Sequence, residues 1–287
     1  MIYDSIVIGA GPAGISAGIY LKNANKNVLI IEKEVPGGKI LKAKNIKNYL
    51  GFTLNDPSKL AYDMYKQVTD LDIPIVMDTV ISILDRDVKK VVTKNNTYEA
   101  KTIIIATGRI EKSLNIENEE KLIGKGISYC ATCDGSLYKN KKIVLIGNNK
   151  ESIEELNYLK NITKDITYIN YDSNDYSDKD INVINSKKVI KINAENDKIS
   201  SIELDDGTII SLDCLFISTG YAPNDSIFKN LNLNIDNGYL VVDKNYKTNI
   251  DGIYAAGDII KKDLYQIVTA ASEGAICATN IIKKLRW

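Results

Sequence analysis

Residues 2–14, IYDSIVIGAGPAG, decide how the chain begins to fold. A short apolar run rich in β-branched residues predicts a buried strand over residues 2–8, and a glycine-rich turn follows it directly. Helical spacing comes next, and NVLIIE at 27–32 predicts a second strand. Together these segments predict a strand–helix–strand unit with parallel strands.

The glycines of this unit, Gly9, Gly11 and Gly14, match the fingerprint of a dinucleotide-binding turn. Gly9 permits the tight turn, Gly11 lets the backbone approach a pyrophosphate, and Gly14 lets the helix pack on the strand. Glu32 ends the second strand, where a carboxylate accepts a hydrogen bond from a ribose hydroxyl. An ordinary glycine turn is the alternative, but strand, helix and acid all stand at the expected places. The fingerprint alone leaves FAD and NAD open.

The composition indicates a globular chain with few groups for proton chemistry. Of its 287 residues, 44% are hydrophobic and 26% are charged, and 37 basic side chains balance 37 acidic ones. This balance gives no overall attraction to nucleic acid or to an anionic membrane. The chain has no histidine, which excludes Ser-His-Asp and Cys-His catalysis and histidine-bound metals. With four cysteines, no signal peptide and no membrane-length apolar run, we expect a cytoplasmic protein.

A second strand–helix–strand pattern starts at KKIVLIG, residues 141–147. It continues with a helix over about 150–161 and the strand DITYIN at 165–170. Further strands are expected at 102–108, as antiparallel β over 73–98, as short strands over 183–217 and in GIYAAGDII at 252–260, with a final helix from about 264 to 285. We expect an α/β fold of two Rossmann-like, three-layer ββα domains. Residues 1–112 and 230–287 form one, and residues 113–229 form a central domain inserted into it.

The segment GIYAAGD at 252–258 supports a flavin rather than NAD in the first domain. Gly257 and Asp258 follow a strand, and a carboxylate there suits the polyol of a ribityl chain. The next helix begins near Gln266, and its positive end would face a flavin ring that becomes anionic on reduction. Thr107 and Gly108 end another strand of the same domain.

CATCDG at 130–135 is the redox motif of the sequence. Cys130 and Cys133 are spaced to close a small, exchangeable disulfide, and the carboxylate of Asp134 can exchange protons with a thiolate. A zinc half-site is the alternative, but it needs four ligands and only the isolated Cys214 and Cys277 remain. We expect these two cysteines to be inert core residues.

Seven segments in this order and spacing resemble the bacterial low-molecular-weight thioredoxin reductases. They are GAGPAG, GGKI at 37–40, NYLGF at 48–52, IIATG at 104–108, GKGISYCATCDG at 124–135, STGYAPN at 218–224 and GIYAAGD. The resemblance implies a homodimeric FAD protein in which Cys133 faces the flavin, Cys130 attacks the disulfide of thioredoxin and Asp134 handles protons. The FAD-binding residues that it implies are Gly9, Gly11, Pro12, Ala13, Gly14, Glu32, Gly38, Lys39, Asn48, Thr107, Gly108, Gly257, Asp258 and Gln266. At Lys39, NADPH-using relatives commonly carry glutamine.

The central domain departs from the NADPH-using members of that family. They carry a second glycine fingerprint where this chain has GNNKES at 147–152, so only Gly147 is kept. They also carry an arginine-rich segment where this chain has NYDSNDYSDKD at 170–180, and an acidic segment repels a 2′-phosphate. Asp172 could hold the unphosphorylated ribose of NADH, but the lost glycines argue against both nucleotides.

This pattern resembles the ferredoxin-dependent flavin thioredoxin reductases of anaerobic bacteria. The resemblance implies reduced ferredoxin as the electron donor and thioredoxin as the acceptor. Plant-type ferredoxins lie near about −400 mV and thioredoxin near about −270 mV, so two-electron transfer is favourable by roughly 6 kcal/mol. A flavin accepts single electrons and delivers a pair.

Lysines gather between residues 22 and 47 and would attract an acidic ferredoxin; they are Lys22, Lys26, Lys33, Lys39, Lys42, Lys44 and Lys47. A solvated surface is the simpler explanation for them. Two alternatives to the ferredoxin-dependent enzyme stay open: a reductase that uses NADH or NADPH, and a flavin redox sensor without turnover. The intact CATCDG motif argues against the sensor.

Overall fold

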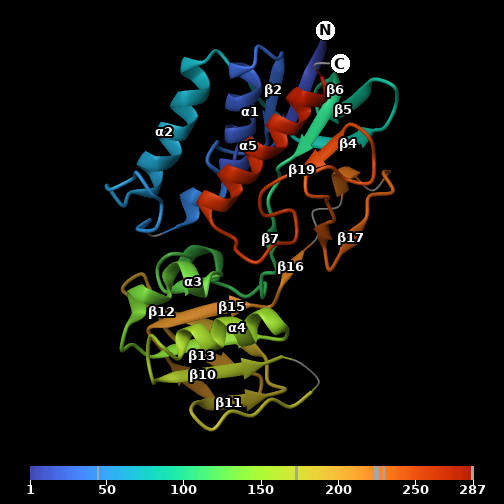
Figure 1. Cartoon of the computed structure of the whole chain (residues 1–287). Coiled ribbons are helices and arrows are strands. Elements are labelled where there is room, and N and C mark those ends of the chain that lie inside the picture. Colours follow the sequence, from blue (N-terminus) through green and yellow to red (C-terminus); the bar gives the residue numbers. More distant parts are fainter. Residues whose placement is uncertain (44, 172–173, 223–225, 229, 286–287) are drawn as a thin grey trace. The chain divides into compact units, whose positions relative to one another are not determined.

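The computed structural model describes residues 1–43, 45–171, 174–222, 226–228 and 230–285, and it divides the chain into two units (Figure 1). Unit 1 comprises residues 1–110 and 223–287, and unit 2 comprises residues 111–222. The chain leaves and re-enters unit 1 through β7 (Ile110–Glu111) and β16 (Tyr221–Ala222), which pair with each other. The second boundary lies earlier than the predicted residue 229 because Ile227 and Phe228 pack into the core of unit 1.

The sheet of unit 1 has the strand order β3-β2-β1-β6-β5-β4, and β19 also pairs with β6. Strands β1, β2, β3, β6 and β19 run parallel, and the buried residues of the central strands β1, β2, β6 and β19 are mostly β-branched, whereas β3 lies at the edge and is partly exposed. The antiparallel pairing predicted for 73–98 is found between β4 and β5 and between β5 and the start of β6, whereas β3 runs parallel to β2. The bounds are β1 Ile2–Ile8, β2 Val28–Glu32, β3 Ile75–Met77, β4 Val80–Leu84, β5 Lys89–Thr93, β6 Thr97–Ile105 and β19 Ile253–Ala255.

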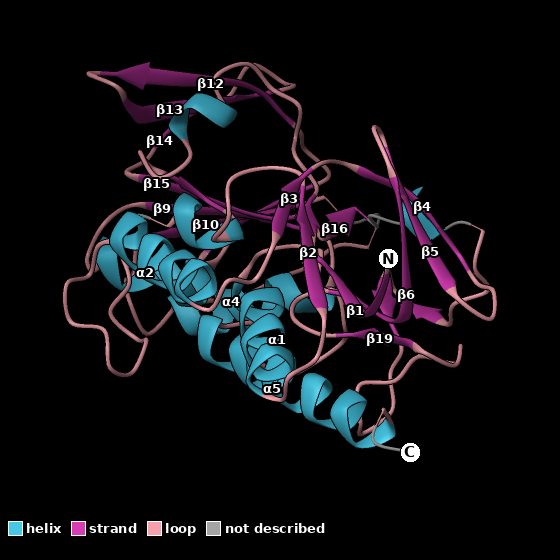
Figure 2. Ribbon diagram, turned by 90° about the horizontal axis from the view of Figure 1, so that it is seen from above, coloured by secondary structure: helices cyan, strands magenta, loops and turns pink. Residues whose placement is uncertain are grey.

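Three helices, α1 (Pro12–Asn23), α2 (Pro57–Asp70) and α5 (Ile267–Lys284), share one hydrophobic core with one face of this sheet (Figure 2). The opposite face packs against residues of β4 and β5 and of the segment 227–260, which gives the predicted three layers. Helix α5 approaches α1 closely, since a Cβ on Gly274 would lie 2.0 Å from the carbonyl oxygen of Ala13.

Unit 2 is a second three-layer unit around the parallel sheet β11-β10-β9-β15-β8. One face packs on α4 (Lys150–Leu159) and the other on an antiparallel three-stranded sheet. The strands are β8 Ile127–Ser128, β9 Ile143–Gly147, β10 Ile166–Asn170, β11 Asn182–Asn185, β12 Val189–Glu195, β13 Lys198–Leu204, β14 Ile209–Ser211 and β15 Cys214–Ser218. The fold class is therefore the one that the sequence predicts.

The shorter elements connect these layers. They are α3 Ala131–Asp134, β17 Ile235–Asp236, β18 Tyr239–Leu240 and the 3₁₀ turns η1 Gly38–Lys42, η2 Glu120–Leu122, η3 Gly135–Tyr138 and η4 Ser226–Phe228. Among the helices of the described residues, none is long and apolar enough to cross a membrane. Cys214 and Cys277 form no disulfide and are fully buried, which confirms that they are core residues.

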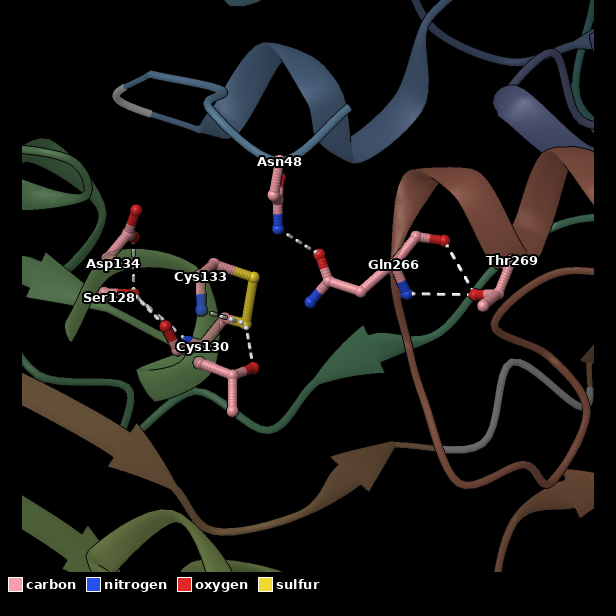
Figure 3. The surroundings of a disulfide bond; sticks show 8 residues. Asn48, Ser128, Cys130, Cys133, Asp134, Gln266 and Thr269 are labelled. Atoms are coloured by element: carbon pink, nitrogen blue, oxygen red, sulfur yellow. Dashed lines mark hydrogen bonds between the residues drawn. A yellow bond between two sulfur atoms is a disulfide. The ribbon is translucent and has the colours of Figure 1, made fainter. Parts of the chain in front are cut away.

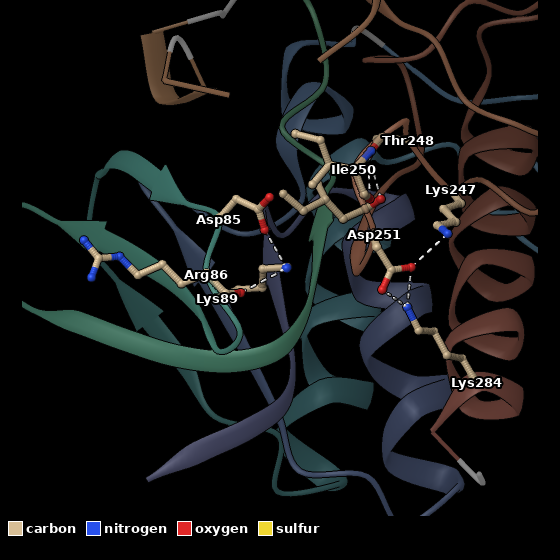
Figure 4. Close-up of polar contacts among 9 residues, drawn as sticks. Asp85, Arg86, Lys89, Lys247, Thr248, Ile250, Asp251 and Lys284 are labelled. Atoms are coloured by element: carbon tan, nitrogen blue, oxygen red, sulfur yellow. Dashed lines mark hydrogen bonds and ion pairs between the residues drawn. The ribbon is translucent and has the colours of Figure 1, made fainter. Parts of the chain in front are cut away.

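Polar contacts of Asp251 tie the end of α5 to the turn before β19 (Figure 4). Its carboxylate pairs with Lys247 at 2.8 Å and with Lys284 at 2.6 Å. These hydrogen bonds lower the pKa of Asp251 to about 2. In the same view Lys89 pairs with Asp85 across the turn between β4 and β5.

We expect Asp251→Asn to lower the free energy of unfolding by about 0.5–1 kcal/mol at pH 7, because the carboxylate is largely exposed and such pairs are weak. The folded pKa lies below the usual value of 3.8, so the carboxylate stabilises the fold fully above about pH 4. That contribution is lost as the pH falls toward 2. Thermal unfolding of both proteins between pH 7 and pH 3 checks this. If the wild-type protein and Asp251→Asn were already equally stable at about pH 5.5, this prediction would be contradicted.

Candidate functional site

The glycine turn after β1 brings together the end of β1, the start of α1 and the end of β6. Gly9 has a φ of +105°, and a Cβ there would lie 2.4 Å from the carbonyl oxygen of Ala106 at the end of β6. A Cβ on Gly14 would lie 1.9 Å from the carbonyl oxygen of Gly9, so α1 can pack on the turn only with glycine there. A Cβ on Gly11 would meet no atom within 4 Å. Gly9 and Gly14 are therefore needed by the fold, whereas Gly11 faces open space.

Pro12 and Ala13 open helix α1 directly behind this turn. Pro12 is the first helical residue, where the missing N–H of proline costs no hydrogen bond. Ala13 is buried, and a Cβ on Gly257 would lie 2.9 Å from its methyl group. The positive end of α1 is thus directed at the open space beside Gly11, which suits a pyrophosphate.

Glu32 lies buried at the end of β2 and holds the glycine turn. Its carboxylate accepts hydrogen bonds from the backbone N–H groups of Ala10, at 2.6 Å, and Glu34, at 2.9 Å. Each carboxylate oxygen has two lone pairs, so these two bonds leave acceptor capacity for a ribose hydroxyl. The predicted acid therefore stands beside the predicted glycines.

The segment after β2 supplies three more predicted residues. Gly38 packs against the turn, since a Cβ there would lie 3.4 Å from the Cα of Gly11. Lys39 follows it in η1 and is partly exposed. Asn48 donates a hydrogen bond to the side-chain oxygen of Gln266 at 2.9 Å, although the two residues are 218 positions apart. Both ends of the chain thus contribute to one site of unit 1.

Thr107 provides an independent observation that a polar ligand belongs here. Its hydroxyl is buried and has no hydrogen-bond partner among the residues that the structure describes. Buried hydroxyls are nearly always paired, so a missing partner indicates a bound group. Gly108 follows with a φ of +66°. The open space at Gly11, the hydroxyl of Thr107 and the acid at Glu32 fit a dinucleotide such as FAD.

A buried charge network, which the sequence did not reveal, fixes the predicted turn at Gly257 and Asp258. Glu273 of α5 accepts hydrogen bonds from the N–H of Gly257 and from Lys262, both at 2.9 Å. Lys262 also pairs with Asp258 at 3.3 Å. Burial raises the pKa of Glu273, and the ammonium of Lys262 opposes that shift. The predicted flavin-binding carboxylate is therefore held by a lysine that no motif singled out.

Helix α5 begins at Gln266, as predicted for the helix directed at the flavin. The backbone N–H of Gln266 donates to the hydroxyl of Thr269 at 3.2 Å, in a capping box. Next to it the guanidinium of Arg109 stacks 4.0 Å above the ring of Tyr265 and donates to the hydroxyl of Tyr239 at 3.2 Å. This stacked cation was missed, because a single arginine after a glycine turn carries no sequence signal.

In unit 2, Cys130 and Cys133 form a disulfide, as their spacing predicts (Figure 3). Cys130 is the N-cap of α3, and its sulfur accepts a hydrogen bond from the N–H of Cys133 at 3.2 Å. The hydroxyl of Thr132 lies 3.4 Å from the same sulfur. Hydrogen bonds to sulfur stabilise a thiolate. After reduction Cys130 is therefore suited to be the attacking thiolate.

Asp134 closes α3 and accepts a hydrogen bond from the hydroxyl of Ser128 at 2.8 Å (Figure 3). Ser128 also accepts a hydrogen bond from the N–H of Cys130 at 3.1 Å. Both predicted catalytic groups are thus linked through one hydroxyl. The part of the chain that the structure describes contains no cluster of three or more cysteine, aspartate or glutamate side chains that could hold a metal ion.

At the end of β9, where the second glycine fingerprint is lost as predicted, the side chain of Asn149 makes two structural hydrogen bonds. The side-chain oxygen of Asn149 accepts from the N–H of Ser152 at 2.8 Å and so caps α4. Its amide nitrogen donates to the carbonyl oxygen of Ser218, the last residue of β15, at 3.3 Å. Asn149 therefore bridges the ends of two neighbouring strands, at the place where the strand order reverses and nucleotides bind in such sheets.

The segment after β10 is held by its own side chains. Asn170 donates to the carbonyl oxygen of Asn174 and to the side chain of Asn185, both at 2.8 Å. Lys160 pairs with Asp178. Asp172, predicted as a ribose ligand for NADH, lies outside the described residues, as do Lys44 of the lysine group and Pro223 and Asn224 of the STGYAPN motif.

Comparison with known proteins agrees with this arrangement. The model of the pyridine nucleotide-disulphide oxidoreductase family matches residues 3–274. The thioredoxin reductase of Ureaplasma parvum is 38% identical in an alignment of 293 positions, which covers 96% of this chain and 95% of the relative. The crystal structure of thioredoxin reductase from Streptococcus pyogenes has a TM-score of 0.91 at 31% identity and covers 99% of this chain and 98% of that one.

A ferredoxin–flavin thioredoxin reductase from Clostridium acetobutylicum is also similar. It is 31% identical, with a TM-score of 0.57, and the match covers 99% of this chain and 98% of that one. The chain therefore belongs to the low-molecular-weight thioredoxin reductases of the pyridine nucleotide-disulphide oxidoreductase family, which are FAD-dependent disulfide oxidoreductases.

Proposed function

We propose that this protein reduces the disulfide of a thioredoxin with electrons from reduced ferredoxin, through FAD and the Cys130–Cys133 disulfide. The observation that carries the choice of donor is the position of Asn149. Its side chain occupies the turn where a pyridine nucleotide would need a glycine, and it spans from β9 to β15.

The N-terminus of α4 supports the same choice. A nucleotide pyrophosphate binds to the free N–H groups at such a helix start. Here the N–H of Ser152 is already bonded to Asn149, and the hydroxyl of Ser152 contacts that of Tyr168 at 3.0 Å. A phosphate would have to break the cap and displace the amide, which costs about 1 kcal/mol for the cap alone.

Charge in unit 2 also disfavours NADPH. Residues 111–222 contain no arginine, so no guanidinium is available there for bidentate contact with a 2′-phosphate. The segment where relatives place that contact instead carries Asp175, Asp178 and Asp180. The C. acetobutylicum protein, which is similar to this chain over nearly its whole length, is named a ferredoxin–flavin thioredoxin reductase. This similarity supports ferredoxin as the donor proposed here.

The residues that we propose to bind FAD all belong to unit 1. Gly9, Gly11 and Gly14 with the start of α1 would hold the pyrophosphate, and Glu32 would hold a ribose. The remaining proposed contacts are Pro12, Ala13, Gly38, Lys39, Asn48, Thr107, Gly108, Gly257, Asp258 and Gln266. When bound, FAD supplies the conversion between single-electron and two-electron transfer.

The disulfide carries the electrons onward in balanced steps. Two reduced ferredoxins each give one electron; the pair breaks the Cys130–Cys133 bond, and two protons are taken up. The thiolate of Cys130 then attacks one sulfur of thioredoxin, and the other sulfur leaves with a proton that Asp134 supplies. Cys133 then attacks the Cys130 sulfur of the mixed disulfide and its proton goes to the second thioredoxin sulfur, which restores the Cys130–Cys133 disulfide and releases thioredoxin as a dithiol.

Exposed lysines of unit 1 suit the docking of an acidic ferredoxin. Lys42 and Lys47 are exposed on and after η1, close in sequence to Gly38 and Asn48. Lys33 is exposed as well, although Glu34 pairs with it at 3.0 Å. Such charges raise association rates more than affinity, so the ferredoxin-dependent rate should fall steeply with added salt. We also propose that the protein is a homodimer and that it works in the cytoplasm.

Turnover with each donor tests the proposal. We expect free thiols to form on thioredoxin when reduced ferredoxin is supplied, and none above background with NADPH or NADH. Thiols formed at a comparable rate with NADPH would identify a pyridine-nucleotide enzyme, and no thiols with any donor would identify a redox sensor.

A single variant isolates the part played by Asn149. We expect Asn149→Gly to bind NADH at least about tenfold more tightly than the unchanged protein, because it opens the turn and glycine is an acceptable N-cap. Isothermal titration of the oxidised holoprotein measures the affinity, and Lys150→Ala at the exposed neighbouring position is the control. Equal affinities for NADH in all three proteins would show that Asn149 does not block the site.

A further inference from the structure

Ser128 is buried at the end of β8, between the two groups of the redox motif. Its hydroxyl donates to Oδ2 of Asp134 at 2.8 Å and accepts from the N–H of Cys130 at 3.1 Å. A longer contact of 3.4 Å joins the same oxygen to the carbonyl oxygen of Cys130. One side chain thus contacts the proposed proton carrier and the backbone of the proposed nucleophile.

The backbone on both sides of Ser128 is fixed. Strand β8 pairs with β15 in register, so that Ser128 lies opposite Phe216. On the other side the hydroxyl of Tyr129 donates to the buried carboxylate of Glu119 at 2.5 Å. Glu119 is in turn bonded to the N–H of Leu114 at 2.9 Å. The backbone that carries the hydroxyl of Ser128 beside Asp134 is therefore held by the strand pairing and by this anchor.

We propose that Ser128 is a positioning residue that holds the carboxylate of Asp134 toward the redox motif and keeps it ionised. A hydroxyl that donates to a carboxylate stabilises the charged form. The charged form is the one that takes the proton from the Cys130 thiol, so that the Cys130 sulfur can form its bond to the target disulfide. The proton then goes from Asp134 to the sulfur that leaves. This inference rests on the proton role proposed above for Asp134.

Three described residues around this carboxylate come from different elements. Ser128 belongs to β8, Cys130 precedes α3, and Tyr138 of η3 interacts electrostatically with Asp134. The Tyr138 hydroxyl has a raised pKa, first because of burial and then because of Cys214, so it remains neutral over the working range. Ser128 donates a hydrogen bond to the carboxylate itself, so removal of its hydroxyl acts directly on the ionisation of Asp134.

The test is a pH profile of the reduced dithiol. The holoenzyme is reduced with dithionite and mixed with the small disulfide 5,5′-dithiobis(2-nitrobenzoate) from pH 5.5 to 9, so that neither ferredoxin nor thioredoxin is needed. We expect Ser128→Ala to move the midpoint of the acid limb upward by about 1 pH unit, since a hydrogen bond to a charged group is lost. Ser128→Thr keeps the hydroxyl and should leave the midpoint unchanged.

Two controls separate this role from a structural one. Tyr129→Phe loosens the neighbouring anchor but leaves the hydroxyl of Ser128 in place, so its midpoint should stay at the wild-type value. Asp134→Asn should move the midpoint to the range of a free thiol, near about 8.5. If Ser128→Ala does not fold, Ser128→Gly removes the same hydroxyl and takes its place.

The outcomes are distinguishable. An unchanged midpoint in Ser128→Ala, together with a shifted one in Asp134→Asn, overturns the role of Ser128 alone. An unchanged midpoint in Asp134→Asn overturns the proton role of Asp134, and with it this inference. Equal shifts in Ser128→Ala and Tyr129→Phe would show that general loosening, not the hydrogen bond, moves the profile.

Discussion

Cys133→Ser is expected to lower disulfide turnover by at least about 10³-fold and to leave Cys130 able to form a lasting mixed disulfide with thioredoxin. The reason is that Cys130 attacks first, and only Cys133 can then resolve the mixed disulfide. Cys130→Ser should lose the same activity without forming the mixed disulfide. Non-reducing gel electrophoresis with intact-mass measurement detects the adduct, and thiol release measures turnover.

Cys277 offers the matched control for this pair of variants. Its thiol is fully buried in α5, and burial raises its pKa, so it should take no part in exchange. Cys277→Ala is therefore expected to keep both turnover and the ability to exchange. A Cys130→Ser protein that still reduced thioredoxin at the normal rate would contradict the assignment, as would a mixed disulfide formed through Cys133 alone.

Gly11→Ala is expected to weaken FAD binding at least about 100-fold while leaving the apoprotein as stable as before. The backbone at Gly11 has φ −78°, which alanine adopts without strain, and its Cβ would meet no protein atom within 4 Å. That open space is the proposed place of the pyrophosphate, so the methyl group would collide only with the cofactor. The flavin-to-protein absorbance ratio and a fluorescence titration with FAD measure the loss.

Gly14→Ala is the comparison that makes this result specific. Its Cβ would lie 1.9 Å from the carbonyl oxygen of Gly9, so the helix would have to move away from the turn. We expect this variant to lose several kcal/mol of stability, by overpacking, even without FAD. Wild-type FAD affinity in Gly11→Ala, or equal loss of apoprotein stability in both variants, would mean that the pyrophosphate does not lie at Gly11.

The glycine turn and the redox motif could be predicted because their chemistry is local. Gly9 and Gly14 stand at fixed distances from a strand end, and Cys130 and Cys133 lie three residues apart. Short sequence spacing places such groups together whatever the rest of the chain does. The burial of Glu32 at the end of β2 follows from the same strand–helix–strand pattern.

Contacts between distant segments could not be predicted in the same way. The pair of Glu273 with Lys262, and the bond from Asn48 to Gln266, exist only after α5 has packed beside α1. The bridge from Asn149 to Ser218 likewise depends on the neighbouring positions of β9 and β15. The lost glycine at this position was visible in the sequence, but its replacement by a cap and a strand bridge was not.

Helix α2 was missed although its start signal is present. Asp56 accepts hydrogen bonds from the N–H groups of Ser58 and Lys59, and Pro57 is the first helical residue. Four of its buried residues, Leu60, Ala61, Met64 and Val68, follow helical spacing. Exposed polar residues between them make the mean hydropathy of the segment low, and no motif follows it. For these reasons the helix was not predicted.

An anaerobic titration of the purified holoprotein tests most directly whether reduced ferredoxin or a pyridine nucleotide is the electron donor. The visible band of oxidised flavin is followed while NADPH, NADH and reduced ferredoxin are added in separate experiments. We expect rapid bleaching by reduced ferredoxin alone, and recovery of the band when oxidised thioredoxin is then added. Rapid bleaching by NADPH or NADH would contradict this expectation and would show that a pyridine nucleotide binds despite the bridge at Asn149.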